Sequence, residues 1–236
     1  MKQPLLYFKF ALQFAIENKT LKHIKQYKRW YKDMKSGETT MSLSLPWMTY
    51  DAIDFLNQIT STENKVFEWG SGGSTLFFAT RCKQVISVEH DKEWSKTLRN
   101  KLQDLKYQNV ILKEVEGENT ENFFKLNPKN ADHFVSKELK STGLSYERYV
   151  KTIDQYDYDY FDIILVDGRV RNACIKKSIP HIKKGGYLIV DNSDRKYYLS
   201  EFNFFNDQEK WEKNEFLGPV FFQHAFSKTT IFRKLF

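Results

Sequence analysis

The sequence predicts an α/β protein with a doubly wound, mostly parallel sheet of seven strands, an antiparallel C-terminal strand and a helical N-terminal appendage. Three observations support this fold class. Short apolar runs alternate with segments of helical spacing, which is typical of parallel sheets covered by helices on both faces. The run 161–166 is almost entirely apolar, as expected for a strand buried on both sides. The strand-like segments 216–223 and 228–233 have no helix between them, so they are expected to pair antiparallel.

Three apolar runs predict the first strands, and segments with helical spacing surround them. The strands are expected at 66–69, 85–88 and 109–115. The helices around them are expected at 49–59, 74–82 and 91–105. In the last helix, Asp91 is placed to cap the N-terminus, and apolar side chains recur every three or four residues along one face. These side chains are Trp94, Leu98, Leu102 and Leu105.

The second half of the sheet is expected after a long polar interruption. Its parallel strands are 161–166 and 187–190, with a helix over 172–182 between them. The preceding segment, 118–145, is too long and too polar for a simple connection, so we interpret it as an inserted cap. A helix over 145–154 then covers the sheet. Inserted caps of this kind often shape substrate sites.

Positive charge is concentrated at the N-terminus. The chain has a net charge of +7, but residues 1–40 hold nine basic side chains against three acidic ones, so the rest is nearly neutral. A neutral body disfavours nucleic acid as a partner. We therefore divide the chain into a basic helical appendage over 1–45 and a domain over 46–236. The basic side chains are Lys2, Lys9, Lys19, Lys22, Lys25, Lys28, Arg29, Lys32 and Lys35.

The appendage is expected to begin with a helix, because apolar side chains recur along one stripe. The stripe consists of Leu5, Phe8, Leu12 and Ile16. One interpretation is that it packs on the domain or on a second subunit of a homo-oligomer. The other is that it makes a peripheral contact with a membrane or docks on a partner protein. Lys9 and Gln13 interrupt the apolar stretch, which argues against a signal peptide.

Composition excludes several classes of protein. Apolar residues make up 41% of the 236 residues and charged residues 28%, which excludes a disordered or collagenous chain. No apolar run approaches the roughly 20 residues of a membrane span. The two cysteines, Cys82 and Cys174, are too few for a disulfide framework and predict buried thiols in a reducing, cytoplasmic compartment.

The strongest motif is a glycine-rich loop between the first strand and its helix. It reads Glu68-Trp69-Gly70-Ser71-Gly72-Gly73-Ser74-Thr75. Glycines allow a ligand to approach the backbone, and the following helix offers free N–H donors. Dinucleotide sites use such loops too, but the carboxylate of Glu68 would repel a pyrophosphate and suits a cationic ligand. Glu89, at the tip of the second strand, is placed to accept hydrogen bonds from both hydroxyls of a ribose.

Taken together, these features resemble the class I S-adenosylmethionine-dependent methyltransferases over about residues 46–236. The resemblance rests on the glycine loop, Glu89, the segments 161–167 and 184–187, and the antiparallel pair. It implies that the loop holds the methionine moiety, the acid after the second strand holds the ribose, and residues after the third strand flank the adenine. The cofactor-binding residues implied are Glu68, Trp69, Gly70, Ser71, Gly72, Gly73, Ser74, Glu89, His90, Glu116, Gly117 and Asp167.

Two carboxylates and an amide follow the fourth and fifth strands, where ligands bind in such sheets. The set of Asp167, Asp191 and Asn192 resembles the magnesium site of catechol-type O-methyltransferases, and oxygen ligands suit that ion. The alternative is an aspartate–arginine network without metal. The arginines available for it are Arg169, Arg171 and Arg195.

The sequence therefore predicts a methyltransferase that acts on a small molecule. Asp167 is the expected base, with His90 as the second candidate. The expected substrate contacts are Arg169, Asp191, Asn192, Trp47 and Tyr50. A weaker resemblance of the segments 166–174 and 185–195 to small bacterial methyltransferases found with glycan-assembly enzymes points to O-methylation of a sugar or nucleotide-sugar in surface glycan biosynthesis. The alternatives are RNA methylation and a non-catalytic scaffold that keeps the fold.

Overall fold

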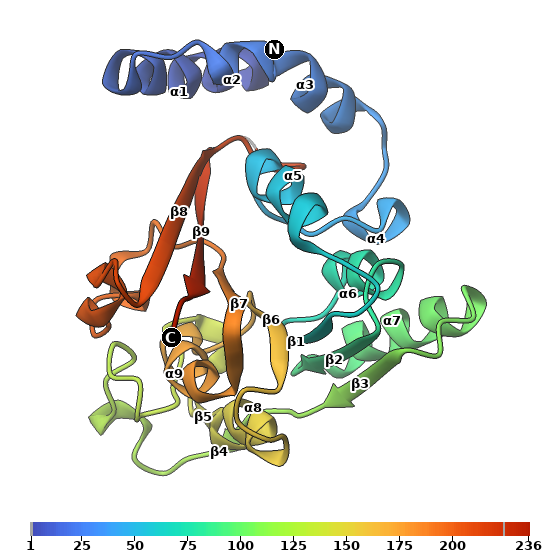
Figure 1. Ribbon diagram of the computed structural model, residues 1–236, viewed down its shortest axis with the longest axis vertical. Coiled ribbons are helices and arrows are strands. Elements are labelled where there is room, and N and C mark those ends of the chain that lie inside the picture. The colour runs from blue at the N-terminus through green and yellow to red at the C-terminus, as the bar shows by residue number, and fades with distance from the viewer. Residues whose placement is uncertain (1, 224) are drawn as a thin grey trace.

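The computed structural model describes the backbone of residues 2–223 and 225–236, and the side chains of residues 4–223 and 225–236. Its centre is a seven-stranded sheet in the order β3-β2-β1-β6-β7-β9-β8 (Figure 1). The first five of these strands run parallel, and β9 lies antiparallel between β7 and β8. The predicted fold class is therefore confirmed. The strands are β1 Lys65–Trp69, β2 Gln84–Glu89, β3 Val110–Glu114, β6 Phe161–Val166, β7 Ile182–Val190, β8 Trp211–Gly218 and β9 Ser227–Lys234.

Helices cover both faces of the sheet, and alternate strand residues point into two separate cores. Phe67 of β1 belongs to the cluster that includes α8 and α9, whereas its neighbour Val66 belongs to the cluster that includes α5 and α6. Ile164 and Ile163 of β6 divide in the same way, because successive side chains of a strand point to opposite faces. The covering helices are α5 Tyr50–Ile59, α6 Gly73–Ala79, α7 Lys92–Asp104, α8 Glu147–Lys151 and α9 Arg171–Ser178.

Several predicted elements begin or end at other residues than those observed. The strand expected at 187–190 begins at Ile182, and the helix expected over 172–182 ends at Ser178. The penultimate strand begins at Trp211 rather than at residue 216, because Trp211 is buried against Phe205 and pairs with Lys234 of β9. The helix expected over 145–154 is shorter and ends at Lys151, followed by a turn of 3₁₀ helix. The inserted segment before it holds two short paired strands, β4 Glu118–Asn119 and β5 Leu144–Ser145.

The appendage lies across one end of the molecule (Figure 1) and consists of α1 Lys2–Asn18, α2 Lys22–Lys25 and α3 Tyr27–Lys35. It packs on the body, but not through the predicted stripe. Tyr7 and Ala11 are buried in a cluster with Trp30, whereas Leu5 and Ile16 are 73% and 75% exposed. Of the two interpretations, only packing of this stripe on the body is contradicted, because α1 carries apolar side chains on two faces and the face with Tyr7 packs on the Trp30 ring, 4.7 Å away.

The predicted boundary at residue 45 is also displaced. A short helix, α4 Thr40–Leu43, packs on the body, where Met41 is buried with Leu76 of α6. A Cβ atom on Gly73 would lie 2.6 Å from the carbonyl oxygen of Thr40. The segment after residue 39 therefore belongs to the domain that holds the glycine loop.

Both cysteines are free and buried, as predicted. In the described part of the chain, no helix is both long and apolar enough to cross a membrane.

Candidate cofactor and acceptor site

The glycine loop closes against the loop that follows β6. Gly70 has a φ of +92°, and a Cβ atom there would lie 2.7 Å from the backbone nitrogen of Gly168. Only glycine therefore allows the two loops to approach so closely. The N–H of Asp167 donates to the carbonyl oxygen of Trp69 over 2.9 Å, which fixes the two strand ends side by side.

Glu68 lies behind this loop rather than in the cavity. It is fully buried, and its carboxylate accepts hydrogen bonds from Ser74 at 2.7 Å, Thr75 at 2.5 Å and Ser87 at 2.7 Å. Burial raises the pKa of Glu68 to about 7, against the opposing effect of these three hydroxyl groups. The predicted direct contact with the cofactor is therefore not observed. Glu68 instead holds the first turn of α6 against β1 and β2.

Trp69 was also expected to contact the cofactor, and its side chain points into the core. The ring is fully buried, and its Nε1 donates to the carbonyl oxygen of Tyr149 over 3.0 Å. The alternation of β1 explains this position, because the residue before Gly70 must point to the face covered by α8.

A cavity of about 330 Å³ lies beside the loop. The predicted residues Gly70, Ser71, Gly72, Gly73, Ser74, Glu89, His90 and Asp167 all line it. Other residues that line the cavity were not predicted as cofactor-binding residues. They are Thr40, Asp91, Trp94, Glu138, Gly168 and Arg171. Trp47 and Arg169, predicted as substrate contacts, complete it. We call this the cofactor cavity.

Glu89 is the acid of the cofactor cavity. Its Oε2 accepts hydrogen bonds from the backbone N–H and the hydroxyl of Ser71, both at 3.0 Å. Its Oε1 accepts from the N–H groups of His90 at 2.8 Å and Asp91 at 2.9 Å. Burial raises the pKa of Glu89, but the hydrogen bonds from His90, Asp91 and Ser71 outweigh burial, so the net shift is downward. The carboxylate is ionised at neutral pH.

Both ring nitrogens of His90 lie close to charged groups, and Nε2 forms a hydrogen bond. Its Nε2 accepts a hydrogen bond from Nε of Arg169 over 2.8 Å, and its Nδ1 lies 2.8 Å from Oε1 of Glu89. Because a guanidinium can only donate, Nε2 carries no proton, and the ring proton is assigned to Nδ1. The second candidate base is therefore not free to accept a proton from a substrate. His90 positions Glu89 and Arg169.

The side of the cavity beyond Glu89 continues into a hollow of about 350 Å³. Glu116 and Gly117, the residues predicted to flank the adenine, line this hollow. His90 and Arg169 belong to both hollows. Arg169 also forms an ion pair with Glu138 of the inserted cap, so the cap is tied to the edge of the cofactor cavity.

A second cavity, of about 660 Å³, adjoins the first and shares Trp47, Asp167 and Arg171 with it. We call it the acceptor cavity. Its other lining residues are Asp191, Asn192, Asp194, Arg195, Gln223, Ala225, Phe226 and Ser227. Tyr50 does not line either cavity, contrary to the prediction. Its ring is buried under the appendage, and its hydroxyl donates to Asp33 over 2.7 Å.

Phe226 connects the acceptor cavity to the appendage. Its ring lies 5.4 Å from Tyr7 and 5.6 Å from Phe10 of α1, and 5.3 Å from His23 of α2. One wall of the acceptor cavity therefore rests on the N-terminal helices.

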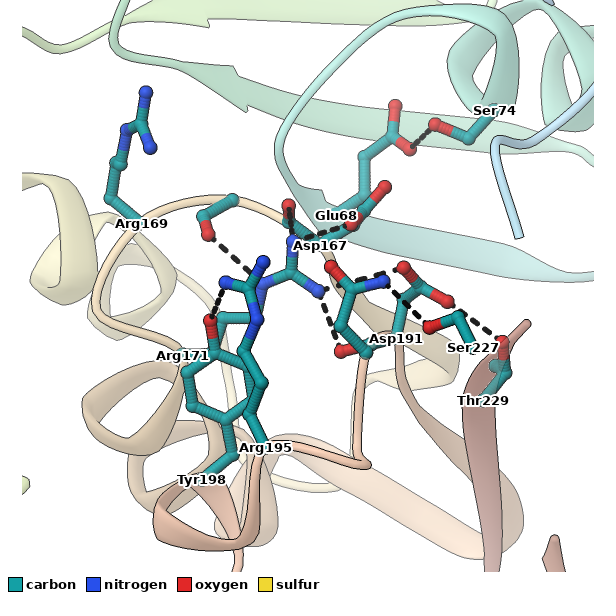
Figure 2. A network of polar contacts seen from close by, with 12 residues as sticks. Glu68, Ser74, Asp167, Arg169, Arg171, Asp191, Arg195, Tyr198, Ser227 and Thr229 are labelled. Atoms are coloured by element: carbon teal, nitrogen blue, oxygen red, sulfur yellow. Dashed lines mark hydrogen bonds and ion pairs between the residues drawn. The ribbon is translucent and has the colours of Figure 1, made fainter. Parts of the chain in front are cut away.

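Arg171 occupies the centre of the network between the two cavities (Figure 2). Its Nη2 lies 2.8 Å from Oδ1 of Asp167, and its Nη1 lies 3.7 Å from Oδ2 of Asp191. The guanidinium also donates to the carbonyl oxygens of Asp191 at 2.5 Å, Asp167 at 2.7 Å and Gly168 at 3.1 Å. Arg171 is thus the cation that binds the ends of β6 and β7 together.

The predicted magnesium ligands do not fit a metal in this arrangement. Arg171 lies between the two carboxylates that a metal ion would bridge. Oδ1 of Asp191 accepts a hydrogen bond from Thr229 over 2.7 Å, and the amide of Asn192 donates to Ser227 over 3.1 Å. The geometry therefore favours the aspartate–arginine network over a metal site.

Asp167 is the acid that both cavities share. Its side chain is 23% exposed. Burial raises its pKa, the charge of Arg171 opposes this shift, and the nearby carboxylates of Asp191 and Glu68 add to it. A carboxylate with a raised pKa is a better proton acceptor than an ordinary surface aspartate.

Two reasons explain why the sequence did not mark some of the residues that line the cofactor cavity. Trp94 is 40% exposed over the glycine loop, where its Nε1 donates to the carbonyl oxygen of Ser71 over 2.8 Å. Helical spacing had placed Trp94 on the apolar face of α7. Its position one turn after the Asp91 cap was the feature that could have indicated a place beside the glycine loop. Thr40 and Glu138 reach the cavity from α4 and the inserted cap, and no local pattern in the sequence marks either of them.

Comparisons with known proteins support the fold. No family model and no curated protein matches the sequence. An O-methyltransferase from Bacillus cereus in complex with SAH has a similar structure, with a TM-score of 0.55, 11% identity, and coverage of 88% of this chain and 99% of the other. A Klebsiella pneumoniae protein assigned as an O-methyltransferase gives a TM-score of 0.58 at 11% identity, and covers 100% of both chains. An rRNA methylase from Streptococcus thermophilus gives 0.50 at 17% identity, with 78% and 93% covered.

These structures share the seven-stranded, mostly parallel sheet with antiparallel C-terminal strands. At identities this low, the similarity concerns the fold. The chain has the fold of the class I S-adenosylmethionine-dependent methyltransferases.

Proposed function

We propose that the protein is an enzyme that transfers the methyl group of S-adenosylmethionine to a hydroxyl group of a small acceptor. The observation that carries this proposal is the position of Asp167, which lines both the cofactor cavity and the acceptor cavity. This position supports a role for Asp167 as the base, at the point where a methyl donor and an acceptor would meet. Two solved structures with this fold contain SAH, the product of that donor.

The residues present fit this cofactor. Gly70 and Gly72 leave room for the methionine moiety, and the ionised Glu89 suits the ribose hydroxyls. The hollow beside Glu116 and Gly117 suits the adenine. When bound, the cofactor supplies a methyl group that its positively charged sulfur has already activated.

The protein's own residues would then align the acceptor and accept its proton. The bound cofactor would supply the methyl group, with its sulfur as the leaving group, and the carboxylate of Asp167 would take the proton of the acceptor's hydroxyl group as its oxygen is methylated. Arg171 holds that carboxylate through its Oδ1, so the second oxygen remains for the acceptor. Alignment supplies most of the rate enhancement in such a displacement.

A sugar or nucleotide-sugar is the acceptor class that the acceptor cavity suits best. Its walls combine an indole, Trp47, with amide and hydroxyl groups from Asn192, Gln223 and Ser227. An aromatic face with surrounding hydrogen-bonding groups is the combination that a sugar requires, because a sugar has apolar C–H faces and a polar edge. We extend this proposal to O-methylation in surface glycan biosynthesis.

The test is a transfer assay with S-adenosylmethionine and separate acceptor panels of sugar nucleotides, catechols and RNA. We expect formation of S-adenosylhomocysteine to rise above background only with sugar nucleotides. Methylation of RNA alone would replace the proposal with the RNA alternative. Binding of S-adenosylmethionine without transfer to any panel, combined with a cavity that no sugar nucleotide occupies in a titration, would contradict the proposed acceptor class.

A further inference from the structure

The first helix has an apolar face that is largely exposed in the described structure, where only the Phe8 ring packs on a ring of another helix, that of Tyr27 at 4.6 Å. Leu5, Leu12 and Ile16 of α1 are 73%, 57% and 75% exposed, and Phe8 between them is 41% exposed. Single exposed apolar side chains are common on protein surfaces, but four on one helical stripe are not. We call these four residues the outer stripe.

The outer stripe points away from the body. Tyr7 and Ala11, which are buried against Trp30, define the inner side of α1. Each residue turns the helix by about 100°, so Leu12 lies roughly 120° and Ile16 roughly 160° around the helix from the middle of the side that holds Tyr7 and Ala11. The outer stripe is consequently accessible in the folded protein without any unfolding of the appendage.

Basic side chains are frequent in the appendage that carries the outer stripe. Lys22 and Arg29 pair with Asp51 at 2.8 Å and Asp54 at 2.9 Å, and these ion pairs tie the appendage to α5. Besides Lys35, which lies over the Tyr31 ring, five further lysines are exposed, and among the described side chains no carboxylate lies within ion-pair distance of them. They are Lys9, Lys19, Lys25, Lys28 and Lys32. The appendage therefore combines an outward apolar stripe with unneutralised positive charge.

We propose that the outer stripe and these five lysines dock the protein on an anionic lipid surface. Helices that lie in the membrane interface combine an apolar stripe with a basic surround. Lysines close to an anionic leaflet strengthen binding, because the negative surface potential of the lipids attracts their positive charge. A second copy of the chain is a less favourable partner for the outer stripe than a lipid surface. Pairing two outer stripes would bring two strongly basic segments together. This inference does not depend on the proposed catalytic activity.

The test uses the full-length protein in co-sedimentation with two kinds of vesicle. One is phosphatidylcholine alone, and the other contains phosphatidylcholine and phosphatidylglycerol in equal parts. We expect binding only to the anionic vesicles, and we expect high salt to weaken it. The double variant Leu12→Gln, Ile16→Gln should bind at least about tenfold more weakly, since two apolar side chains no longer leave water. Lys25→Gln with Lys28→Gln should weaken binding about fivefold for each charge removed.

Matched controls separate docking from folding and from dimerisation. Phe124→Gln removes an apolar side chain that is 90% exposed outside the appendage, so it should bind vesicles like the natural chain. Cofactor titration of the Leu12, Ile16 variant should be unchanged, because neither residue lines a cavity. Absence of binding to anionic vesicles, or equal binding to neutral ones, would overturn the proposal. So would a dimer in light scattering that this variant converts to a monomer, since that would assign the outer stripe to a second copy.

Discussion

At the scale of single residues, we expect Glu89 to contribute to the affinity for the proposed cofactor. Its carboxylate is ionised and lines the cofactor cavity. Glu89→Ala should weaken S-adenosylmethionine binding by roughly 1.5–3 kcal/mol, the usual worth of charge-assisted hydrogen bonds. Calorimetric titration checks this, with Asp104→Asn at the exposed end of α7 as the control. Unchanged affinity in a folded Glu89 variant would refute the ribose assignment.

Asp167 should separate catalysis from cofactor binding. Asp167→Asn removes the base and keeps the side chain's shape, so turnover should fall by about 10²–10⁴-fold. The exposed acid Asp132, which pairs with Lys176, provides the control as Asp132→Asn. A chelator should leave turnover of the natural chain unchanged, because Arg171 takes the place of a cation between the carboxylates. Loss of activity in chelator and recovery with Mg²⁺ would restore the metal interpretation.

Glu68 should make stability depend on pH. Its pKa is about 7 in the folded protein and 4.5 as the ordinary value, so between these values the folded state holds a proton that the unfolded state has lost. The free energy of unfolding contributed by Glu68 therefore falls as pH rises through this range, by up to about 3 kcal/mol.

Glu68→Gln should remove this decline, because glutamine does not titrate. Urea unfolding without cofactor between about pH 5 and pH 8 measures the effect. Glu63→Gln is the control, since the Glu63 side chain is 83% exposed. A variant that keeps the full pH dependence would show that Glu68 titrates at its ordinary pKa in the folded chain.

Candidate site residues could be predicted from the sequence where a local pattern determines their position in the fold. Glu89 and Asp167 end strands whose apolar runs are unmistakable, so their positions at the carboxyl edge follow from topology. Tyr50 does not belong to any such apolar run. Its burial under the appendage depends on contacts with Asp33 and Phe221. Such contacts join segments far apart in sequence, and periodicity contains no information about them.

At the scale of elements, the sheet was predictable and the appendage was only partly so. The buried strands are apolar on both faces, so their identity does not depend on which neighbour covers them. The first helix is different, because it has two apolar faces and only one can pack on the body. The aromatic side chain of Tyr7, which also donates to the carbonyl oxygen of His23 over 2.5 Å, decides between the faces.

The contact between α4 and α6 gives a prediction at this scale. A Cβ atom on Gly73 would lie 2.2 Å from the carbonyl oxygen of Leu45 and 2.6 Å from that of Thr40. Gly73→Ala should therefore displace α4 and destabilise the protein by about 1–3 kcal/mol. Thermal unfolding measures the cost, and titration should show weaker cofactor binding because Thr40 lines the cofactor cavity. A variant with the natural melting temperature would mean that α4 is not held against the glycine loop.

At the scale of the whole molecule, the appendage should be separable from cofactor binding. Deleting residues 1–38 leaves Thr39, whose hydroxyl accepts from the N–H of Ser42 and caps α4. The shortened chain should still bind S-adenosylmethionine, because no residue before Thr40 lines the cofactor cavity. It should be less stable by about 3 kcal/mol or more, since Tyr50 and Phe221 become exposed. Circular dichroism and titration check both results, and a shortened chain that cannot bind the cofactor contradicts the division.

The position of Phe226 connects the appendage to the proposed specificity for the acceptor. The wall that it forms in the acceptor cavity is supported by Tyr7 and Phe10, whereas among the described residues none before Thr40 lines the cofactor cavity. If the proposed function holds, changes in α1 would therefore alter the choice of acceptor and leave binding of the methyl donor intact. Homologous chains with different N-terminal helices would then share one methyl donor and diverge in what they methylate, with the appendage serving as the exchangeable part.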